Sequence, residues 1–166
     1  MGILEMLHLR RRRTPFGEYV SPKVIRKLLR ETKPGVIPPP QVKHFQFVVI
    51  LVDDTNPQQV SAMLDTVIDT LFQHHVSVTN MMPSLLVGVL GVPFREGNSA
   101  EARQELVGAL LREHGERIRI AHGECDALVG AFGGHARHAY GALIPGFSGI
   151  LKKLLETKFG TAVEVS

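Results

Sequence analysis

Residues 64–93, LDTVIDTLFQHHVSVTNMMPSLLVGVLGVP, decide the fold, because the spacing of their apolar residues changes from helical to extended. The apolar residues Leu64, Val67, Ile68 and Leu71 recur at helical spacing, which predicts an amphipathic helix. Residues 76–80 and 85–92 are rich in Val and Leu and are separated by Met81-Met82-Pro83-Ser84. They predict two strands joined by a tight turn, and a hairpin is the simplest pairing.

The residues on either side of this stretch extend the alternation of helix and strand. His44 to Val52 reads as a largely buried strand, and Asn56 with Pro57 starts the helix, which we place over residues 57–74. Ser99 caps a second helix that stops at Gly115.

The last fifty residues predict shorter elements. We expect strands at 117–121, 127–132, 139–144 and 161–165 and a helix over 148–159, with a loop after Gly133-Gly134 that holds His135, Arg137 and His138. The whole order predicts an α+β protein with a ferredoxin-like βαββαβ sheet, helices on one face and a C-terminal extension.

The first forty-three residues differ from the rest. Ser21-Pro22 is a typical helix start, and Val24, Ile25, Leu28 and Leu29 lie on one face of an expected helix over residues 21–32. The prolines of residues 33–41, KPGVIPPPQ, then impose an extended linker. We therefore divide the chain into an N-terminal region, 1–43, and a main domain, 44–166.

Charge is divided in the same way. The chain has 166 residues and a net charge of +3, but residues 1–43 carry +7 and the remainder carries −4. The arginines Arg10, Arg11, Arg12 and Arg13 predict contact with an anionic surface, which is a membrane, a nucleic acid or an acidic protein face; the alternative is a solvated, poorly ordered terminus.

Bulk composition indicates a globular protein with one core. Apolar residues make up 44% and charged residues 21% of the chain, and no apolar run approaches the 18 to 20 or so residues that span a bilayer. Without a signal-peptide pattern, we expect a cytoplasmic protein. Cys125 is the single cysteine, and we expect it to be a small buried residue.

Three stretches of the chain resemble the class III nucleotidyl cyclases, the catalytic domains of adenylate and guanylate cyclases. Residues 16–25, FGEYVSPKVI, resemble the segment that precedes many bacterial cyclase domains. Residues 64–93 resemble the helix, turn and hairpin of these domains. Gly123-Glu124, residues 129–133 (VGAFG) and Tyr140 resemble later family segments. The resemblance implies a cyclase-like fold and a dimer, with composite sites at the interface.

The family's chemistry requires two aspartates for two metal ions, a Lys and an Asp that read the base, and an Asn and an Arg that stabilise the transition state. Here Asp54, with Asp53 beside it, matches the first metal aspartate, and Ser84 stands at the second. A serine hydroxyl cannot replace an anionic ligand shared by two ions. The remaining positions fall at Asn80 for the Lys, Pro145 or Gly146 for the Asp, Ser148 or Gly149 for the Asn, and Lys152 or Lys153 for the Arg.

These substitutions predict a catalytically inactive cyclase-like domain that acts as a dimerisation or regulatory module and needs no cofactor. Its expected partner is a second copy or another cyclase-like protein. One alternative is a nucleotide-binding protein or a subunit of a heterodimeric cyclase; another is an anionic-surface binder that uses the N-terminal arginines. Asp53 and Asp54 remain candidate ligands for a single ion, together with Glu124 or Asp126.

Overall fold

A computed structural model of the chain describes residues 40–92, 97–134 and 137–166. The expected helix over 21–32, Arg10 to Arg13 and His135 lie outside these residues. Among the described helices, none is long and apolar enough to cross a membrane.

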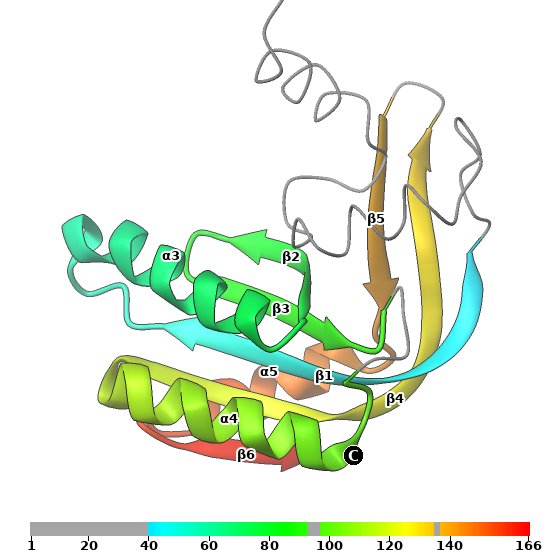
Figure 1. Cartoon of the computed structure of the whole chain (residues 1–166). Helices are drawn as coiled ribbons and strands as arrows, with labels where there is room; N and C mark the ends of the chain where they lie inside the picture. The colour runs from blue at the N-terminus through cyan, green and yellow to red at the C-terminus, as the bar shows by residue number, and fades with distance from the viewer. Residues whose placement is uncertain (1–39, 93–96, 135–136) are drawn as a thin grey trace, which may run out of the picture.

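The first half of the described chain alternates strand, helix and hairpin as the apolar spacing predicts (Figure 1). The Asn56 side chain accepts a hydrogen bond from the Gln58 amide at the start of the first helix, with proline in its first turn, as expected of an N-cap. The elements are β1 (Gln41–Val52), α3 (Pro57–Gln73), β2 (Ser77–Met82) and β3 (Leu85–Leu90).

The second half contains the second helix of the βαββαβ unit and the C-terminal extension. The Ser99 hydroxyl accepts a hydrogen bond from the Ala102 amide at 3.1 Å, and Gly115 follows the last helical residue with φ of 51°. The elements are α4 (Ala100–His114), the short 3-10 helix η1 (Gly115–Arg117), β4 (Ile118–Gly134), β5 (Arg137–Leu143), α5 (Phe147–Glu156) and β6 (Ala162–Val165).

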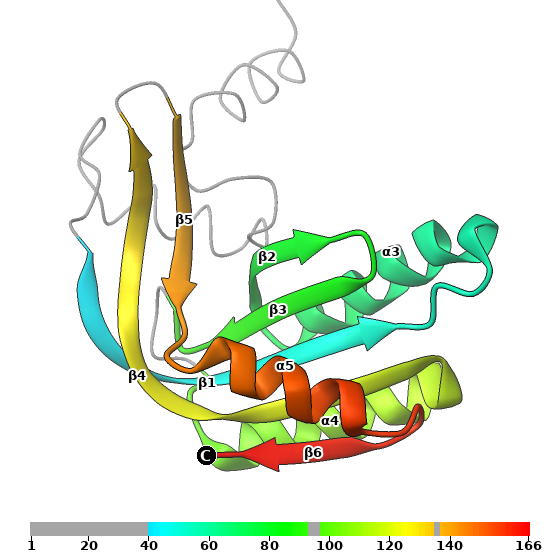
Figure 2. The ribbon, with the colours of Figure 1, turned by 180° about the vertical axis from the view of Figure 1, so that it is seen from behind.

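The strands form one sheet in the order β2-β3-β1-β4-β5. All neighbours on this path are antiparallel, whereas β6 pairs in parallel with the first half of β4. The β2–β3 hairpin forms as predicted and pairs with β1 through β3. This strand order confirms the ferredoxin-like arrangement. Figure 2 shows β4 bending along its length, so that its second half carries β5 away from the rest of the sheet.

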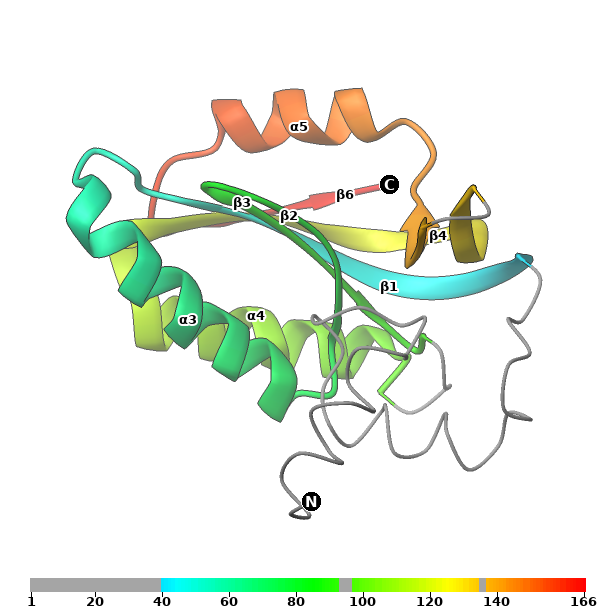
Figure 3. The same cartoon turned by 90° about the horizontal axis from the view of Figure 1, so that it is seen from above.

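The sheet separates two cores because side chains alternate between its faces. Val48, Ile50 and Val52 of β1 pack with α3 and α4, whereas Phe45 and Phe47 pack with α5. Figure 3 shows α3 and α4 on one side of the sheet and α5 on the other. The two helices of the βαββαβ unit thus share one face, and the C-terminal extension covers the opposite face.

Several sequence predictions need correction. Met81 and Met82, expected in the tight turn, belong to β2. The expected strands at 117–121 and 127–132 belong to one strand, β4, because residues 118–129 pair without a break with β1 and the strand continues to Gly134 beside β5. Arg137 and His138 belong to β5, not to a loop, since they pair with Gly134 and Gly133. β1 begins at Gln41, three residues earlier than predicted, and Cys125 is only half-buried.

Burial of α5 predicts the effect of one substitution on stability. Leu154 is 0% exposed in the core between α5 and the sheet, so Leu154→Ala should lower the free energy of unfolding by about 2–5 kcal/mol. The exposed neighbour provides the control, and Lys153→Ala should change it by less than about 0.5 kcal/mol. Urea denaturation followed by circular dichroism measures both; equal effects would contradict this packing.

Candidate functional site

The end of β1 and the turn between β2 and β3 lie side by side. The Val52 amide donates to the Ser84 carbonyl at 2.8 Å, and the next amide, of Asp53, donates to the Arg117 carbonyl at 2.8 Å. Asp54 follows directly. The structure therefore brings together Asp53, Asp54 and Ser84, the positions that the sequence comparison assigned to metal binding; we call this place the catalytic edge.

The two acids of the catalytic edge differ in their surroundings. The Asp53 carboxylate accepts a hydrogen bond from the Thr55 amide at 3.0 Å, and this bond holds the pKa of Asp53 below its ordinary value. Asp54 is exposed, and Ser84 is half-buried. At this edge, the carboxylates thus come from one strand end, and one of the two is already engaged in a local turn.

The C-terminal half of α5 lies at the same end of the sheet. Arg119, which pairs with Leu51 of β1, donates to the carbonyls of Leu155 and Thr157 at 2.8 and 3.1 Å. Its guanidinium also lies 4.6 Å from the centre of the Phe159 ring. These contacts fix the helix end whose cationic residues, Lys152 and Lys153, are exposed.

The other expected site positions are spread along α5 and β2. Pro145 and Gly146 precede α5, and Ser148 and Gly149 lie in its first turn, about 6–8 Å along the helix axis from Lys153. Asn80 pairs with Val87 in the middle of the hairpin. Within one chain, the structure therefore gathers only the metal-binding positions and the end of α5.

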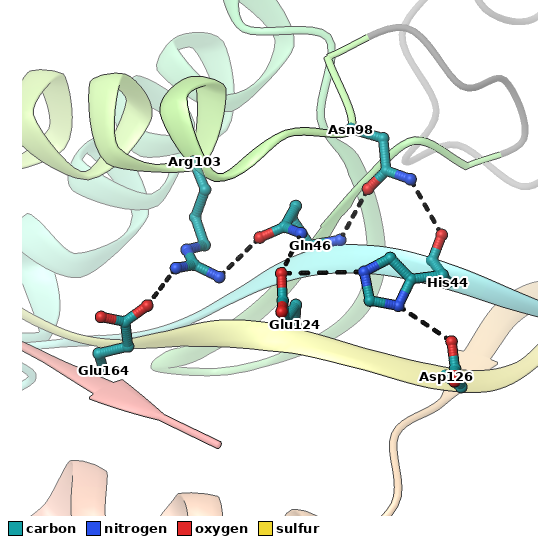
Figure 4. A network of polar contacts seen from close by, with 7 residues as sticks. All are labelled: His44, Gln46, Asn98, Arg103, Glu124, Asp126 and Glu164. Atoms are coloured by element: carbon teal, nitrogen blue, oxygen red, sulfur yellow. Dashed lines mark hydrogen bonds and ion pairs between the residues drawn. The ribbon is translucent and has the colours of Figure 1, made fainter.

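A second polar arrangement lies on the face that α4 covers (Figure 4). Arg103 of α4 is 3% exposed; its guanidinium donates to the Gln46 side chain at 2.6 Å and to the carboxylate of Glu164 on β6. Gln46 donates onward to Glu124 at 2.8 Å. A charged group buried this deeply is stable only with such partners.

The same network reaches the surface through histidine and asparagine. His44 Nδ1 lies 2.9 Å from Asp126 Oδ1, and Asn98 bridges the backbone of His44 and Gln46 at 3.0 and 3.1 Å. Figure 4 shows the contacts running from Arg103 on α4, past Gln46 and Glu124, to His44 and Asp126, with Asn98 joining from its own loop. The network joins β1, β4, β6 and α4, so we assign it a structural role.

Among the comparisons with known proteins, the one with solved structures supports the architecture. No protein-family model and no curated sequence matches the chain. Several solved structures do. The guanylyl cyclase Cya2 has a TM-score of 0.58 at 14% identity, over 76% of this chain and 77% of that chain. A bacterial light-regulated adenylyl cyclase has a TM-score of 0.63 at 12% identity, over 93% of this chain and 51% of that chain. A guanylyl cyclase domain of the fungus Blastocladiella emersonii has a TM-score of 0.61 at 10% identity, over 76% of this chain and 82% of that chain.

The chain has the fold of a nucleotidyl cyclase domain. At identities of 10–14% the likeness is one of fold, so the chemistry must be judged from the residues themselves. Among the described residues, no group of three or more His, Cys, Asp or Glu side chains is placed to hold a metal ion. Glu124 and Asp126, considered as partners for Asp53 and Asp54, instead contact Gln46 and His44.

Sequence analysis did not identify the Arg103 network, although a signal was present. Arg103 falls on the same helical face as Leu106, Val107 and Leu110, where a charged residue is unexpected. Gln46 likewise interrupts an otherwise apolar strand. A polar residue within an apolar stripe indicates a buried hydrogen-bond partner, and here each residue is a partner of the other.

His122 of β4 makes stability depend on pH. Burial first, and then the charge of Arg103, holds the pKa of His122 below its ordinary value, although Glu164 opposes the shift. Because the unfolded chain binds the proton more readily, the free energy of unfolding should fall as the pH drops from about 7 through 6.5 to 5. His114 contributes in the same direction, since burial also lowers its pKa.

Denaturation curves at about pH 7.5, 6.5 and 5.5 measure this effect. His122→Gln should give a flatter dependence than the unchanged chain, and His122→Gln with His114→Gln a flatter one still. If the free energy of unfolding depended on pH equally in the variants and in the unchanged chain, the assignment would be contradicted.

Proposed function

We propose that this cyclase-fold chain is a catalytically inactive domain that acts through dimerisation or regulatory interaction. The observation that carries the proposal is the catalytic edge, where Ser84 stands beside Asp53 and Asp54. Two-metal phosphoryl chemistry needs anionic ligands on both sides of the ion pair to offset its charge. A neutral hydroxyl beside one free carboxylate does not meet that need.

The residues of α5 add to this argument. Where a transition-state arginine would offer a planar fork with two parallel donors, Lys152 and Lys153 offer single-point charges. Ser148 and Gly149, at the position of the transition-state amide, provide at most a hydroxyl. The changed residues thus affect both metal binding and transition-state stabilisation. This argues against an active cyclase that a single substitution has merely slowed.

Exposed apolar side chains next to the catalytic edge favour an interaction role. Met82 shares the α5 face with its cross-strand neighbour Leu85, and it is 44% exposed. Leu155, in the last turn of α5, is 58% exposed, and Phe159, three residues beyond the helix, is 36% exposed. Large apolar groups at one end of one face are typical of a protein interface. A second copy of this chain is the partner we propose.

The absence of turnover is the first expected result. Purified protein incubated with ATP or GTP and Mg²⁺ or Mn²⁺ should form no cyclic nucleotide, and calorimetry should show nucleotide binding weaker than about 1 mM. Cyclic nucleotide formation that Asp54→Asn abolishes would overturn the proposal. Asp65→Asn, an exposed acid on α3, is the matched control.

Self-association is the second expected result. Sedimentation velocity over a range of concentrations should show a monomer–dimer equilibrium, and Leu155→Lys should weaken it at least about tenfold by placing a charge in the apolar interface. Asp65→Lys introduces the same residue at an exposed position of α3, on the opposite side of the sheet, and it should leave the equilibrium unchanged. A monomer at every concentration would exclude the homodimer.

A further inference from the structure

An exposed apolar row crosses the bent arm of the sheet, on the face opposite α5. Val42 of β1 pairs with Leu128 of β4, which in turn pairs with Leu143 of β5. These three side chains are 73%, 37% and 59% exposed. We call them the tip row.

The tip row forms a continuous surface. Side chains at directly paired positions on antiparallel strands lie about 4.5–5.5 Å apart, so the three touch or nearly touch. Single exposed leucines are ordinary on protein surfaces, but three in register across three strands are not scattered. Their alignment indicates a surface that something apolar covers.

Acidic groups border the tip row on the same face. Asp126 and Glu124 are two and four residues before Leu128 on β4, so their side chains share its face. Their side chains are 71% and 55% exposed, although they also contact His44 and Gln46. A partner for this surface should therefore combine apolar residues with basic ones.

The chain enters β1 across this same face. A Cβ added to Gly130 would lie 2.5 Å from the Cα and 3.0 Å from the Cβ of Pro40, so Pro40 passes directly over β4 at that point. Gly130 is two residues beyond Leu128 and shares its face. The described chain therefore begins, at Pro40, on the side of the sheet that carries the tip row.

The sequence immediately upstream has the required chemistry. Residues 21–32, SPKVIRKLLRET, combine an apolar stripe of Val24, Ile25, Leu28 and Leu29 with the bases Lys23, Arg26, Lys27 and Arg30. The linker over residues 33–40 spans up to about 25 Å in an extended proline-rich conformation. That reach is sufficient to bring the segment back over the tip row.

We propose that residues 21–32 dock on the tip row of their own chain. The apolar stripe covers Val42, Leu128 and Leu143, and the bases face Asp126 and Glu124. This contact fixes the N-terminal region to the β4–β5 arm, away from the catalytic edge. It does not depend on the proposed loss of catalysis.

Disulfide trapping in the full-length chain tests the contact. In a Cys125→Ala background, the pair Leu28→Cys and Leu128→Cys should oxidise to an intramolecular disulfide under mild copper–phenanthroline treatment. The matched control pairs Leu28→Cys with Leu155→Cys, an exposed leucine at the end of α5 on the opposite face. Non-reducing electrophoresis and peptide mass spectrometry follow the bond, which should form at least tenfold faster in the first pair.

Each result has a definite meaning. Fast formation within one chain in the Leu128 pair alone supports the proposal. Equal rates in the two pairs, or no bond in either, overturn it. In the Leu128 pair, a disulfide that joins two chains also overturns it, since the occupant of the tip row would then be a second copy.

A charge reversal tests the acidic border separately. In the same cysteine pair, Asp126→Lys should slow disulfide formation at least fivefold, whereas Glu105→Lys, an exposed acid on α4, should leave it unchanged. An unchanged rate in both variants would overturn the charge pairing. Circular dichroism of each variant confirms that the sheet is intact.

Discussion

The rest of the fold depends on β1, because it hydrogen-bonds to β3 on one side and to β4 on the other. Its residues 45–50 are all buried, and their alternate side chains enter two separate cores. A strand enclosed in this way presents no side chains to a ligand along its centre. What β1 offers to other molecules therefore lies at its two ends, Asp53-Asp54 at one and Gln41 to His44 at the other.

The buried guanidinium of Arg103 imposes a second constraint. β6 has only four residues, and Val165 is its one fully buried side chain, so apolar burial alone holds this strand weakly. Glu164 pairs with Arg103, whose other bond reaches Gln46 of β1. The ion pair thereby fixes the register of β6 against β4, and it explains why a cationic residue occupies the apolar face of α4.

The sequence predicted the parts of the fold in which local pattern and tertiary environment agree. The caps at Asn56 and Ser99 and the hairpin around Pro83 lie close to where the apolar spacing placed them. It failed for β4, because Gly123 and Glu124 suggested a break. In the folded chain, Gly123 is required instead for close packing, since a Cβ there would collide with the Val165 carbonyl. The assignment of Asp53, Asp54 and Ser84 to a metal-binding position followed from family resemblance. The Arg103 network instead depends on long-range pairing that no local pattern reveals.

The positions that the family resemblance assigns to metal binding differ from the residues that stabilise the fold. Asp54 is exposed and Ser84 lies in a turn, so changes at these positions cost little stability. β3 is the opposite case, since all six of its residues are buried and a polar substitution there would disrupt both cores. Substitutions at Asp54 and Ser84 therefore leave the sheet and its exposed apolar groups in place. A cyclase fold with changed residues at the strand end still presents these surfaces, and our proposal of an interaction role rests on them.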